Sequence, residues 1–288
     1  MICSLCPRAC RAERNETDGS GFCAMPSTAR IAAARAHMWE EPCISGKNGS
    51  GTIFFSGCPL GCVFCQNSVI SHDKLGADKT PEQLAEIMRS LEESGVHNIS
   101  FVTGTHFTHQ IIKALKIYRP SVPIVWNSGG YESEETIDAL SGYVDIWLPD
   151  FKFAFSNIAE KYAGAPDYPE VVKRALLLMR KYAPEDKFDG DVMTAGVIVR
   201  HLVLPLNTKN SAAVLEWLAE NMPGTLVSIM AQYFPAGRAS EFPELSRKIT
   251  RREYEKVLDC AERLGIEGFA QELSSAKEEY VPQFSDKV

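Results

Sequence analysis

Three cysteines lie close together in the chain, Cys58, Cys62 and Cys65, in the spacing C-x3-C-x2-C. Soft thiolate ligands select iron–sulfur clusters, zinc or copper(I). Three thiolates are one short of the four that close a [4Fe–4S] cluster or a structural zinc site. The missing ligand leaves an open coordination position where substrate chemistry can occur. The alternative is a closed zinc or redox site that borrows a fourth cysteine from elsewhere.

The segment around these cysteines has the features needed to position them. The apolar run 53–55 has the length and composition of a buried strand, and a loop begins at Gly57. Gly57 and Gly61 let the backbone turn tightly around a bound group. The apolar side chains of Val63 and Phe64 would shield that group from water.

A second group of four cysteines begins the chain: Cys3, Cys6, Cys10 and Cys23, spaced C-x2-C-x3-C-x12-C. This segment has little apolar periodicity and cannot fold on a core of its own, so metal ligation is its expected organiser. Four thiolates would close a zinc site or a second [4Fe–4S] cluster, and the spacing does not distinguish them. A set of reduced, buried cysteines is the alternative, and Cys43 could replace one of the four ligands.

The cysteine loop that follows the first strand resembles the signature of the radical S-adenosylmethionine (SAM) superfamily. More narrowly, the words GSGTIFFSGC and CVFCQN resemble pyruvate formate-lyase activating enzyme-like proteins, the branch related to glycyl-radical activases. The resemblance extends from Cys3 to about Gln271. It implies that an unligated iron binds the amino and carboxylate groups of SAM. An electron from the cluster then cleaves SAM to methionine and a 5'-deoxyadenosyl radical, which abstracts a hydrogen from the substrate.

Composition and charge exclude several other classes. A net charge of −7 argues against general nucleic-acid binding, and no apolar run reaches membrane-spanning length. The N-terminus lacks an apolar signal core, so we expect a cytoplasmic protein. Eight of the nine cysteines lie in the first 65 residues, which in a cytosolic chain indicates metal rather than disulfides. Cys260, within a helical pattern, is expected to be a buried small apolar residue.

Alternating strand and helix patterns predict a parallel α/β fold. Strands are expected over 98–104, 123–130, 144–152, 196–205 and 225–235, and helices over 80–95, around 111–115, from 133, and over 169–182, 211–221 and 250–264. A doubly wound sheet would give the same pattern, but the resemblance implies a partial (β/α)6 barrel with active groups at the C-terminal strand ends.

The predicted organisation is a cysteine-rich segment and lead-in over 1–50, a radical SAM core over 51–275 and a tail over 276–288. In the lead-in, residues 31–42 would form a strand or a helix, and 40–51 a loop. His37, Glu40 and Glu41 could line the site.

Residues at the end of the strand 98–104 are the first candidates for SAM binding. The superfamily usually has Gly-Gly-Glu here, which binds the SAM amino group, and this chain instead has Thr103, Gly104 and Thr105. Gly104 still allows close backbone approach. His106 is a candidate for a substrate contact or proton donor, the alternative being a histidine buried against the barrel wall.

The next two strand ends supply four more candidates. Asn127 and Ser128 suit the carboxylate or ribose of SAM, or form a simple turn. Strand alternation places Asp150 and Lys152 on one face. They resemble the Asp-x-Lys pair that contacts SAM in glycyl-radical activating enzymes, and a mutual ion pair is the alternative.

The last two strands carry further polar residues. Arg200 would bind a carboxylate through its forked donors, whereas His201 faces the opposite way in a regular strand. Gln232 would contact adenine or substrate, or lie at a strand end in water. His201 and Tyr233 join His106 as candidate substrate contacts or proton donors.

The identity of the substrate stays open. It would be a small molecule or another macromolecule, or the backbone glycine of a glycyl-radical-type partner protein. The N-terminal cysteines precede the main loop, whereas activases with ferredoxin-type clusters carry theirs after it. A flavodoxin- or ferredoxin-like protein would be the reductant. The alternative from another class is a non-enzymatic iron–sulfur electron carrier.

Overall fold

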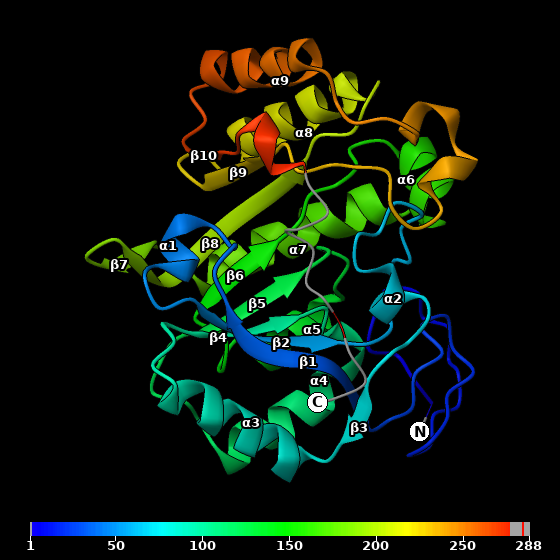
Figure 1. The fold of residues 1–288 in the computed structure, drawn as a ribbon, viewed down its shortest axis with the longest axis vertical. Helices are drawn as coiled ribbons and strands as arrows, with labels where there is room; N and C mark the ends of the chain where they lie inside the picture. Colours follow the sequence, from blue (N-terminus) through cyan, green and yellow to red (C-terminus); the bar gives the residue numbers. More distant parts are fainter. Residues whose placement is uncertain (1, 277–283, 285–288) are drawn as a thin grey trace.

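The computed structural model describes residues 2–276 and residue 284. Of the predicted tail over 276–288, only residues 276 and 284 are therefore described. Within the described residues the strands are β1 Ala29–His37, β2 Ser50–Phe55, β3 Ala77–Lys79, β4 Ile99–Val102, β5 Ile124–Ser128, β6 Ile146–Pro149, β7 Lys187–Asp189, β8 Val192–Leu202, β9 Leu226–Met230 and β10 Gly268–Ala270. They form one sheet in the order β10-β9-β8-β6-β5-β4-β2-β1-β3, with β7 paired to β8 (Figure 1).

Six strands of this sheet form the parallel barrel that the resemblance implied: β2, β4, β5, β6, β8 and β9. β10 extends it as a further parallel strand, while β1 and β3 continue the sheet antiparallel at the other edge. The sheet curves without closing. The prediction of an α/β protein with a partial (β/α)6 barrel is therefore confirmed.

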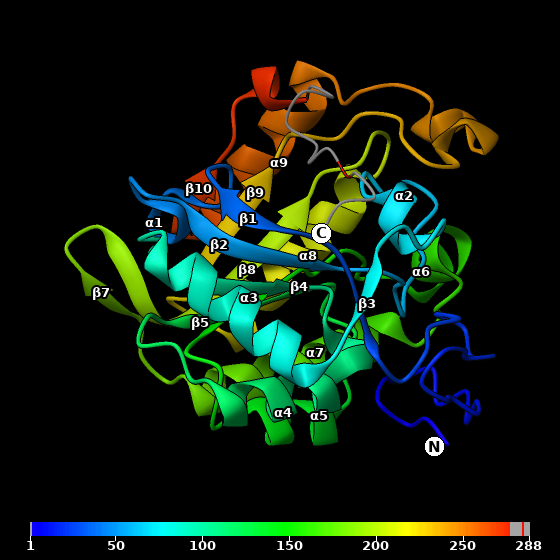
Figure 2. The same ribbon diagram turned by 60° about the horizontal axis from the view of Figure 1, so that its bottom comes forward.

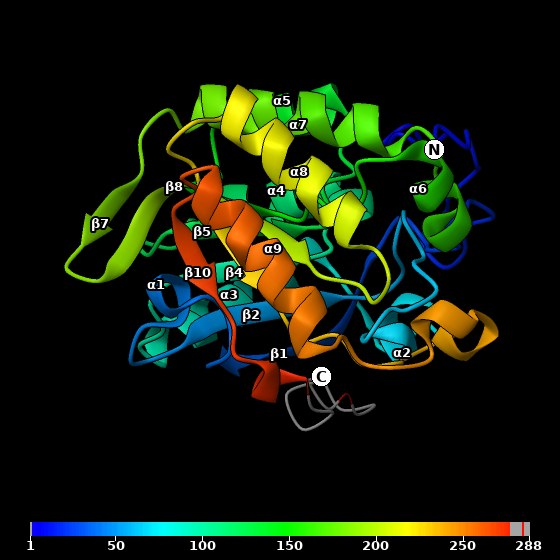
Figure 3. The ribbon, with the colours of Figure 1, turned by 90° about the horizontal axis from the view of Figure 1, so that it is seen from above.

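Helices cover the outside of the curved sheet (Figures 2 and 3). The α-helices are α1 Pro42–Ser45, α2 Ser68–Ser71, α3 Pro81–Glu93, α4 Thr108–Ile117, α5 Glu134–Leu140, α6 Ser156–Ala163, α7 Tyr168–Tyr182, α8 Thr208–Asn221 and α9 Arg251–Arg263. Short 3-10 helices span Thr105–Phe107, Ala239–Glu241, Pro243–Leu245 and Leu273–Ser275. Neighbouring helices pack in chain order from α3 through α4 and α5 to α7, and α8 packs on α9.

The helix that follows Thr80 begins as its sequence predicts. The Thr80 side chain accepts from the Gln83 amide, and the Gln83 side chain accepts from the Thr80 amide in return, which completes a capping box. Pro81 occupies the first helical turn, where its missing N–H costs nothing. Thr250 and Glu253 start α9 with the same device.

Strand alternation divides the apolar side chains between two sides of the sheet. Trp126 and Trp147 are fully buried beneath the outer helices, whereas their neighbours Val125 and Ile146 point into the barrel lumen. Cys43 and Ile44 of α1 pack against this lumen layer. α1 therefore closes the amino-terminal end of the barrel, and the polar strand ends lie at the opposite, carboxyl end.

The lead-in segment, which was predicted to form a strand or a helix, forms a strand. β1 runs antiparallel to β2, with Ala36 opposite Gly51, so residues 29–37 belong to the barrel sheet itself. The loop expected over 40–51 was wrong in part, because Pro42 starts the one-turn helix α1. The sequence-based prediction also left out α2, α6, β3, β7 and β10. Cys260 is buried in α9, as predicted. No helix of the described residues is long and apolar enough to cross a membrane.

Candidate functional site

The cysteine loop leaves β2 and enters the mouth of the barrel. Gly57 adopts a φ of +76°, and its amide donates to the Ile70 carbonyl at 2.9 Å, so the chain turns sharply after Phe55. Phe64 then fixes the loop against the barrel by packing edge-on to Phe153, at 6.1 Å between ring centroids, and to Tyr162 and Tyr233. The loop is therefore held by aromatic packing, while the shielding of a bound group by Val63 and Phe64 stays a prediction.

The three thiols of this loop line one cavity of about 350 Å³ at the carboxyl ends of the strands. Burial raises the pKa of Cys58 to about 11 and that of Cys62 to about 12, and burial also raises the pKa of Cys65. Hydrogen-bonding groups reach two of the sulfurs: the Leu60 amide donates to Cys58 at 3.3 Å, and the Ser71 hydroxyl lies 3.1 Å from Cys65. Such thiols become stable thiolates when a cationic metal group binds them.

The donor set of the loop fits a [4Fe–4S] cluster, because its three thiols line one cavity. Zinc–sulfur bonds of about 2.3 Å would instead draw thiolates tightly around one point. In a [4Fe–4S] cluster each thiolate binds a different iron, so the thiols need to share a cavity rather than a point.

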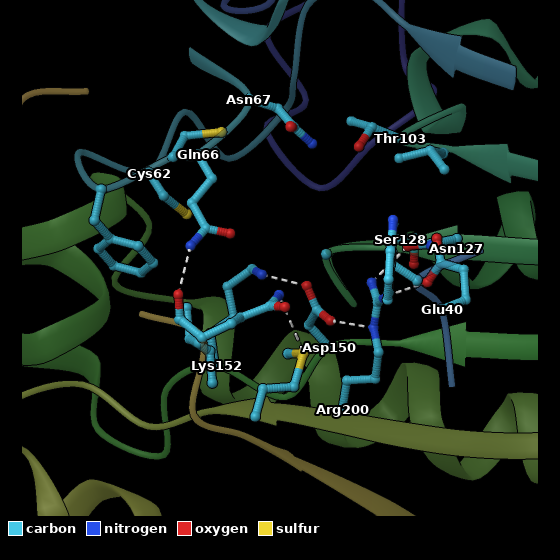
Figure 4. Close-up of a pocket in the computed structure, with 18 of the residues that line it drawn as sticks. Glu40, Cys62, Gln66, Asn67, Thr103, Asn127, Ser128, Asp150, Lys152 and Arg200 are labelled. Carbon is cyan, nitrogen blue, oxygen red and sulfur yellow. Dashed lines mark hydrogen bonds and ion pairs between the residues drawn. The ribbon is translucent and has the colours of Figure 1, made fainter. Parts of the chain in front are cut away.

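Facing the thiols is a layer of charged side chains from three strand ends (Figure 4). Arg200 of β8 donates from Nε to Asp150 at 2.8 Å, from Nη1 to Glu40 at 3.1 Å and from Nη2 to Asn127 at 2.5 Å. Lys152 pairs with the other oxygen of Asp150. Asn127 in turn donates to Glu40 at 3.1 Å. We call these five residues the polar layer.

Charges in the polar layer nearly compensate one another. Burial alone would raise the pKa of Asp150, but the positive charges of Arg200 and Lys152 outweigh it and lower that pKa. Burial raises the pKa of Glu40 and of the neighbouring Glu41. Glu41 Oε2 is buried and has no hydrogen-bond partner among the described residues. Within the polar layer, the carboxylates of Glu40 and Asp150 pair with the two cations Lys152 and Arg200.

A glycine allows the ends of β5 and β6 to lie close together. Gly130 follows β5 with a φ of +73°, and a Cβ there would lie 2.3 Å from the Asp150 carbonyl oxygen. The Asp150 amide donates to the Ser128 carbonyl at 2.9 Å and continues the β5–β6 pairing past Pro149. The glycine of the NSGGY turn therefore leaves the space that the Asp150 backbone occupies, and so helps to set the position of Asp150.

The cavity brings together most of the residues that the sequence singled out: Cys58, Cys62, Cys65, Thr103, Asn127, Ser128, Asp150, Lys152, Arg200 and Gln232. His37, Glu40 and Glu41 line it as well. Gln232 receives a hydrogen bond from Gln271 at 3.3 Å, and its backbone carbonyl accepts from Gln66 at 2.9 Å. Gln271 and Ser275 come from the chain after β9, and the sequence reading missed them.

Gln66 and Asn67 were also missed as lining residues, although they directly follow Cys65 and that adjacency could have identified them. Trp39 lines the cavity from the segment after β1. It also borders a second cavity of about 980 Å³, which shares Glu40, Glu41 and Gln271 with the first.

The remaining strand-end candidates lie outside the cavity lining. Gly104 packs against Ile111 and Trp126, where a Cβ would lie 2.7 Å from the Ile111 side chain. Thr105 donates its hydroxyl to the buried carboxylate of Glu132 at 2.7 Å. Glu132 is a further functional candidate that the sequence reading missed, since burial raises its pKa to about 7.

The three proton-donor candidates are also buried away from the cavity lining. His106 Nε2 lies 2.7 Å from the Ser56 carbonyl oxygen, and burial lowers the pKa of His106 to about 3. His201 faces away from Arg200, as alternation requires, and bonds Ser211 at 2.9 Å. Tyr233 donates to the Leu245 carbonyl at 2.6 Å. Their roles in proton transfer stay predictions.

The N-terminal cysteines gather beside the cysteine loop. Cys3 is buried, Cys6 and Cys23 are half-buried, and Cys10 is exposed. The charges of the other three thiols act on Cys6, whose pKa burial raises to about 12. The Cys43 side chain is elsewhere, in the barrel floor with Val125 and Ile146.

Backbone conformation in this segment is unusual. Ala9, Arg11 and Ala24 have positive φ values of 42°, 49° and 47°, and each adjoins Cys10 or Cys23. Such left-handed residues cost on the order of 1–3 kcal/mol each unless their surroundings impose them. In this segment they flank Cys10 and Cys23, two of the four cysteines predicted to bind a metal.

Comparison with known proteins places the chain in a family. The model of the radical SAM superfamily matches residues 52–218, more than half of the 288 residues. MJ0674, an uncharacterized protein of Methanocaldococcus jannaschii, is 32% identical over 277 residues, covering 92% of this chain and 75% of that protein.

Solved structures share the fold at low sequence identity. SuiB of Streptococcus suis bound to its precursor peptide SuiA has a TM-score of 0.52 and 14% identity, with 80% of this chain and 51% of that chain covered. The chain thus spans about half the length of SuiB. Methylornithine synthase (PylB) has a TM-score of 0.50 and 15% identity, with 76% and 66% covered. The cysteine loop, the barrel and the family match lead to one conclusion: the chain belongs to the radical SAM superfamily, a family of enzymes that use a [4Fe–4S] cluster and SAM.

Proposed function

We propose that Cys58, Cys62 and Cys65 hold a site-differentiated [4Fe–4S] cluster and that the same cavity binds SAM beside a substrate. The observation that carries the proposal is the shared cavity, in which three thiols of one loop face the polar layer. When bound, the cluster supplies an electron and SAM supplies the 5'-deoxyadenosyl radical that removes a hydrogen from the substrate.

The polar layer suits the amino-acid end of SAM. Asp150 can accept from the ammonium or the ribose, while Lys152 and Arg200 can donate to the carboxylate. Asn127 and Ser128 add neutral hydrogen-bonding groups at the neighbouring strand end. Each charged group of the polar layer already has a partner in the layer. On binding, the charged groups of SAM would therefore replace some of these ion pairs rather than contact unpaired charges.

Other lining residues orient the rest of the ligand and exclude water. Thr103 lies at the strand end where the superfamily binds the SAM amino group, and it lines the cavity whereas Gly104 and Thr105 do not. Gln232 is placed for the adenine or the substrate. Apolar side chains complete the wall and keep water from a reactive group: Phe54, Leu60, Phe64, Val102, Leu202, Met230 and Phe234.

The partners follow from this chemistry. A flavodoxin- or ferredoxin-like protein would deliver single electrons. The substrate is a small molecule or a partner protein, and the narrower resemblance keeps a glycyl-radical enzyme activase as the second candidate. The first cysteine group, Cys3, Cys6, Cys10 and Cys23, would hold zinc or a second [4Fe–4S] cluster.

The test is anaerobic reconstitution of the full chain, reduction with dithionite in the presence of SAM, and detection of 5'-deoxyadenosine by mass spectrometry. We expect wild type to form it. Cys58→Ala, Cys62→Ala and Cys65→Ala should form none and should lose about one cluster's iron, while Cys260→Ala in α9 serves as the matched control and should behave as wild type.

An intact cluster that neither binds SAM nor yields 5'-deoxyadenosine would contradict the proposal and favour an electron carrier. A glycyl radical detected by electron paramagnetic resonance on a partner protein would identify an activase. Metal analysis of the variant with Ala at all four N-terminal cysteines would show whether that group holds zinc or iron.

A further inference from the structure

The two cysteine groups are in direct contact. Gly61 of the cysteine loop packs on the Phe22 ring, where a Cβ would lie 3.3 Å from the ring carbons. Gly57 packs on the turn that follows Cys23, where a Cβ would lie 2.4 Å from Met25 Cγ and 3.2 Å from the Cys23 carbonyl oxygen. The N-terminal segment is thus one wall of the loop that carries the SAM cluster (Figures 1 and 3).

Arg8 spans this contact. Its Nε donates to the Pro59 carbonyl at 2.7 Å, and its Nη2 donates to the Leu60 carbonyl at 3.1 Å. The same guanidinium donates to the Ala163 carbonyl at 2.7 Å and to Gly164 at the end of α6. One side chain therefore ties the cysteine loop and a helix end to the N-terminal segment.

The Phe22 ring holds the Arg8 side chain in place. Its centroid lies 3.8 Å from the guanidinium carbon of Arg8. A lysine has no planar fork and cannot reproduce this set of contacts.

The connection begins at the turn that carries Cys6 and ends on a sulfur of the cysteine loop. The Ala9 amide donates to the Cys6 carbonyl at 3.0 Å and closes a turn that contains Arg8. At the other end, Leu60 accepts from Arg8 through its carbonyl and donates through its amide to Cys58 Sγ at 3.3 Å. A path of backbone and hydrogen bonds therefore runs from Cys6 through Arg8 and Leu60 to the Cys58 sulfur.

We propose that Arg8 is a positioning residue that couples metal ligation at Cys6 to the hydrogen bond on Cys58. This rests on the proposed function, in which Cys58 ligates the SAM cluster and Cys6 belongs to the second metal group. A metal held by Cys6 fixes the Arg8 backbone, Arg8 then fixes the carbonyls of Pro59 and Leu60, and the Leu60 amide stays directed at the Cys58 sulfur. Hydrogen bonds to cluster sulfurs stabilise the reduced, more negative state, so this path raises the reduction potential of the SAM cluster.

The test compares the full chain with Arg8→Met, Arg8→Lys, Cys6→Ser and the double variant Arg8→Met/Cys6→Ser, with Arg11→Lys as the matched control. A redox titration followed by electron paramagnetic resonance gives the midpoint potential, and the signal that changes when SAM is added belongs to the SAM cluster. We expect Arg8→Met, Arg8→Lys and Cys6→Ser to shift that potential to more negative values. The double variant should shift it no further than Arg8→Met alone, and Arg11→Lys should match wild type.

A wild-type potential in an Arg8→Met protein that retains its iron would overturn the proposal, and so would fully additive shifts. Hydrogen–deuterium exchange of the peptide over 59–64, measured in the full chain without the SAM cluster, provides a readout that does not need the cluster. Exchange should be faster in Arg8→Lys and Cys6→Ser than in wild type, and equal rates would overturn the coupling. If wild type forms no SAM cluster, the proposed function fails, while this exchange comparison still decides whether Arg8 couples the two groups.

Discussion

Arg200 on β8 and Glu40, in the segment after β1, form a buried ion pair across the mouth of the barrel, with 3.1 Å between Nη1 and Oε2. Their side chains are 13% and 9% exposed. The same guanidinium also donates to Asp150 and Asn127, so one side chain joins the ends of β5, β6 and β8 to the lead-in. The polar layer is thereby a single hydrogen-bonded unit rather than a set of independent contacts.

Arg200→Lys should weaken SAM binding by about 10- to 100-fold, because an ammonium cannot serve Asp150, Glu40 and Asn127 together with a ligand carboxylate. Anaerobic isothermal titration of the reconstituted protein measures this. Arg119→Lys changes an exposed arginine paired with Asp145 and should leave the affinity unchanged. Equal affinities for the two variants would show that Arg200 does not contact SAM.

Asp150→Ala should destabilise the apoprotein by about 3–5 kcal/mol, because Arg200 and Lys152 would both lose a buried counter-ion. The control, Glu86→Ala, removes an exposed partner of Arg89 and should cost less than about 1 kcal/mol. Urea unfolding followed by circular dichroism provides both values. A cost for Asp150→Ala as small as that for Glu86→Ala would contradict the paired arrangement.

Gly130→Ala should both destabilise the chain and impair SAM binding. The new Cβ would collide with the Asp150 carbonyl, and the positive φ disfavours any L side chain. Gly142→Ala introduces the same methyl group where no heavy atom lies within 4 Å of the new Cβ. Thermal melts and SAM titrations of the two variants should differ clearly, and matching behaviour would mean that the turn adapts.

Glu132 makes stability depend on pH. Its pKa is raised by burial from 4.5 to about 7 in the folded state, so the folded state binds the extra proton between these values. The stabilisation is complete below about pH 4.5 and is lost as the pH rises through 7. Glu132→Gln is uncharged throughout, so over this range wild type should lose on the order of 3 kcal/mol relative to it.

Melting temperatures of both apoproteins from pH 4.5 to 8 test the role of Glu132, and the comparison cancels the other titrating groups. Curves that stay parallel would show that folding does not raise the pKa of Glu132.

Sequence reasoning was correct where strand alternation determines which way a side chain points. Alternation along β8 correctly separated Arg200 from His201, and the two-residue spacing correctly put Asp150 and Lys152 on one face. Sequence reasoning could not tell which residues just beyond the strand ends line the cavity and which are buried against the barrel wall. A single 3-10 turn over Thr105–Phe107 directs His106 back to Ser56, and no sequence pattern marked that turn.

Residues contributed by distant segments were also beyond prediction. Gln271 reaches the cavity because β10 pairs with β9, and β10 is only three residues long with two of them exposed. Trp39 depends on how β1 ends before α1, and no sequence pattern marked it, although the adjacent Glu40 was predicted to line the site. In both cases long-range packing, not local preference, decides which side chain faces the site.

The four-residue helix α1 has a consequence for the shape of the ligands that this barrel can admit. Cys43 and Ile44 fill the lumen below the polar layer, so a guest cannot go deeper than Asp150 and Arg200. The adjoining hollow of about 980 Å³ shares Trp39 and Gln271 with the cavity, so it offers lateral space for a portion of a substrate that exceeds the room beside SAM. The space around the mouth, rather than the depth of the barrel, would therefore limit how large a molecule the enzyme can process.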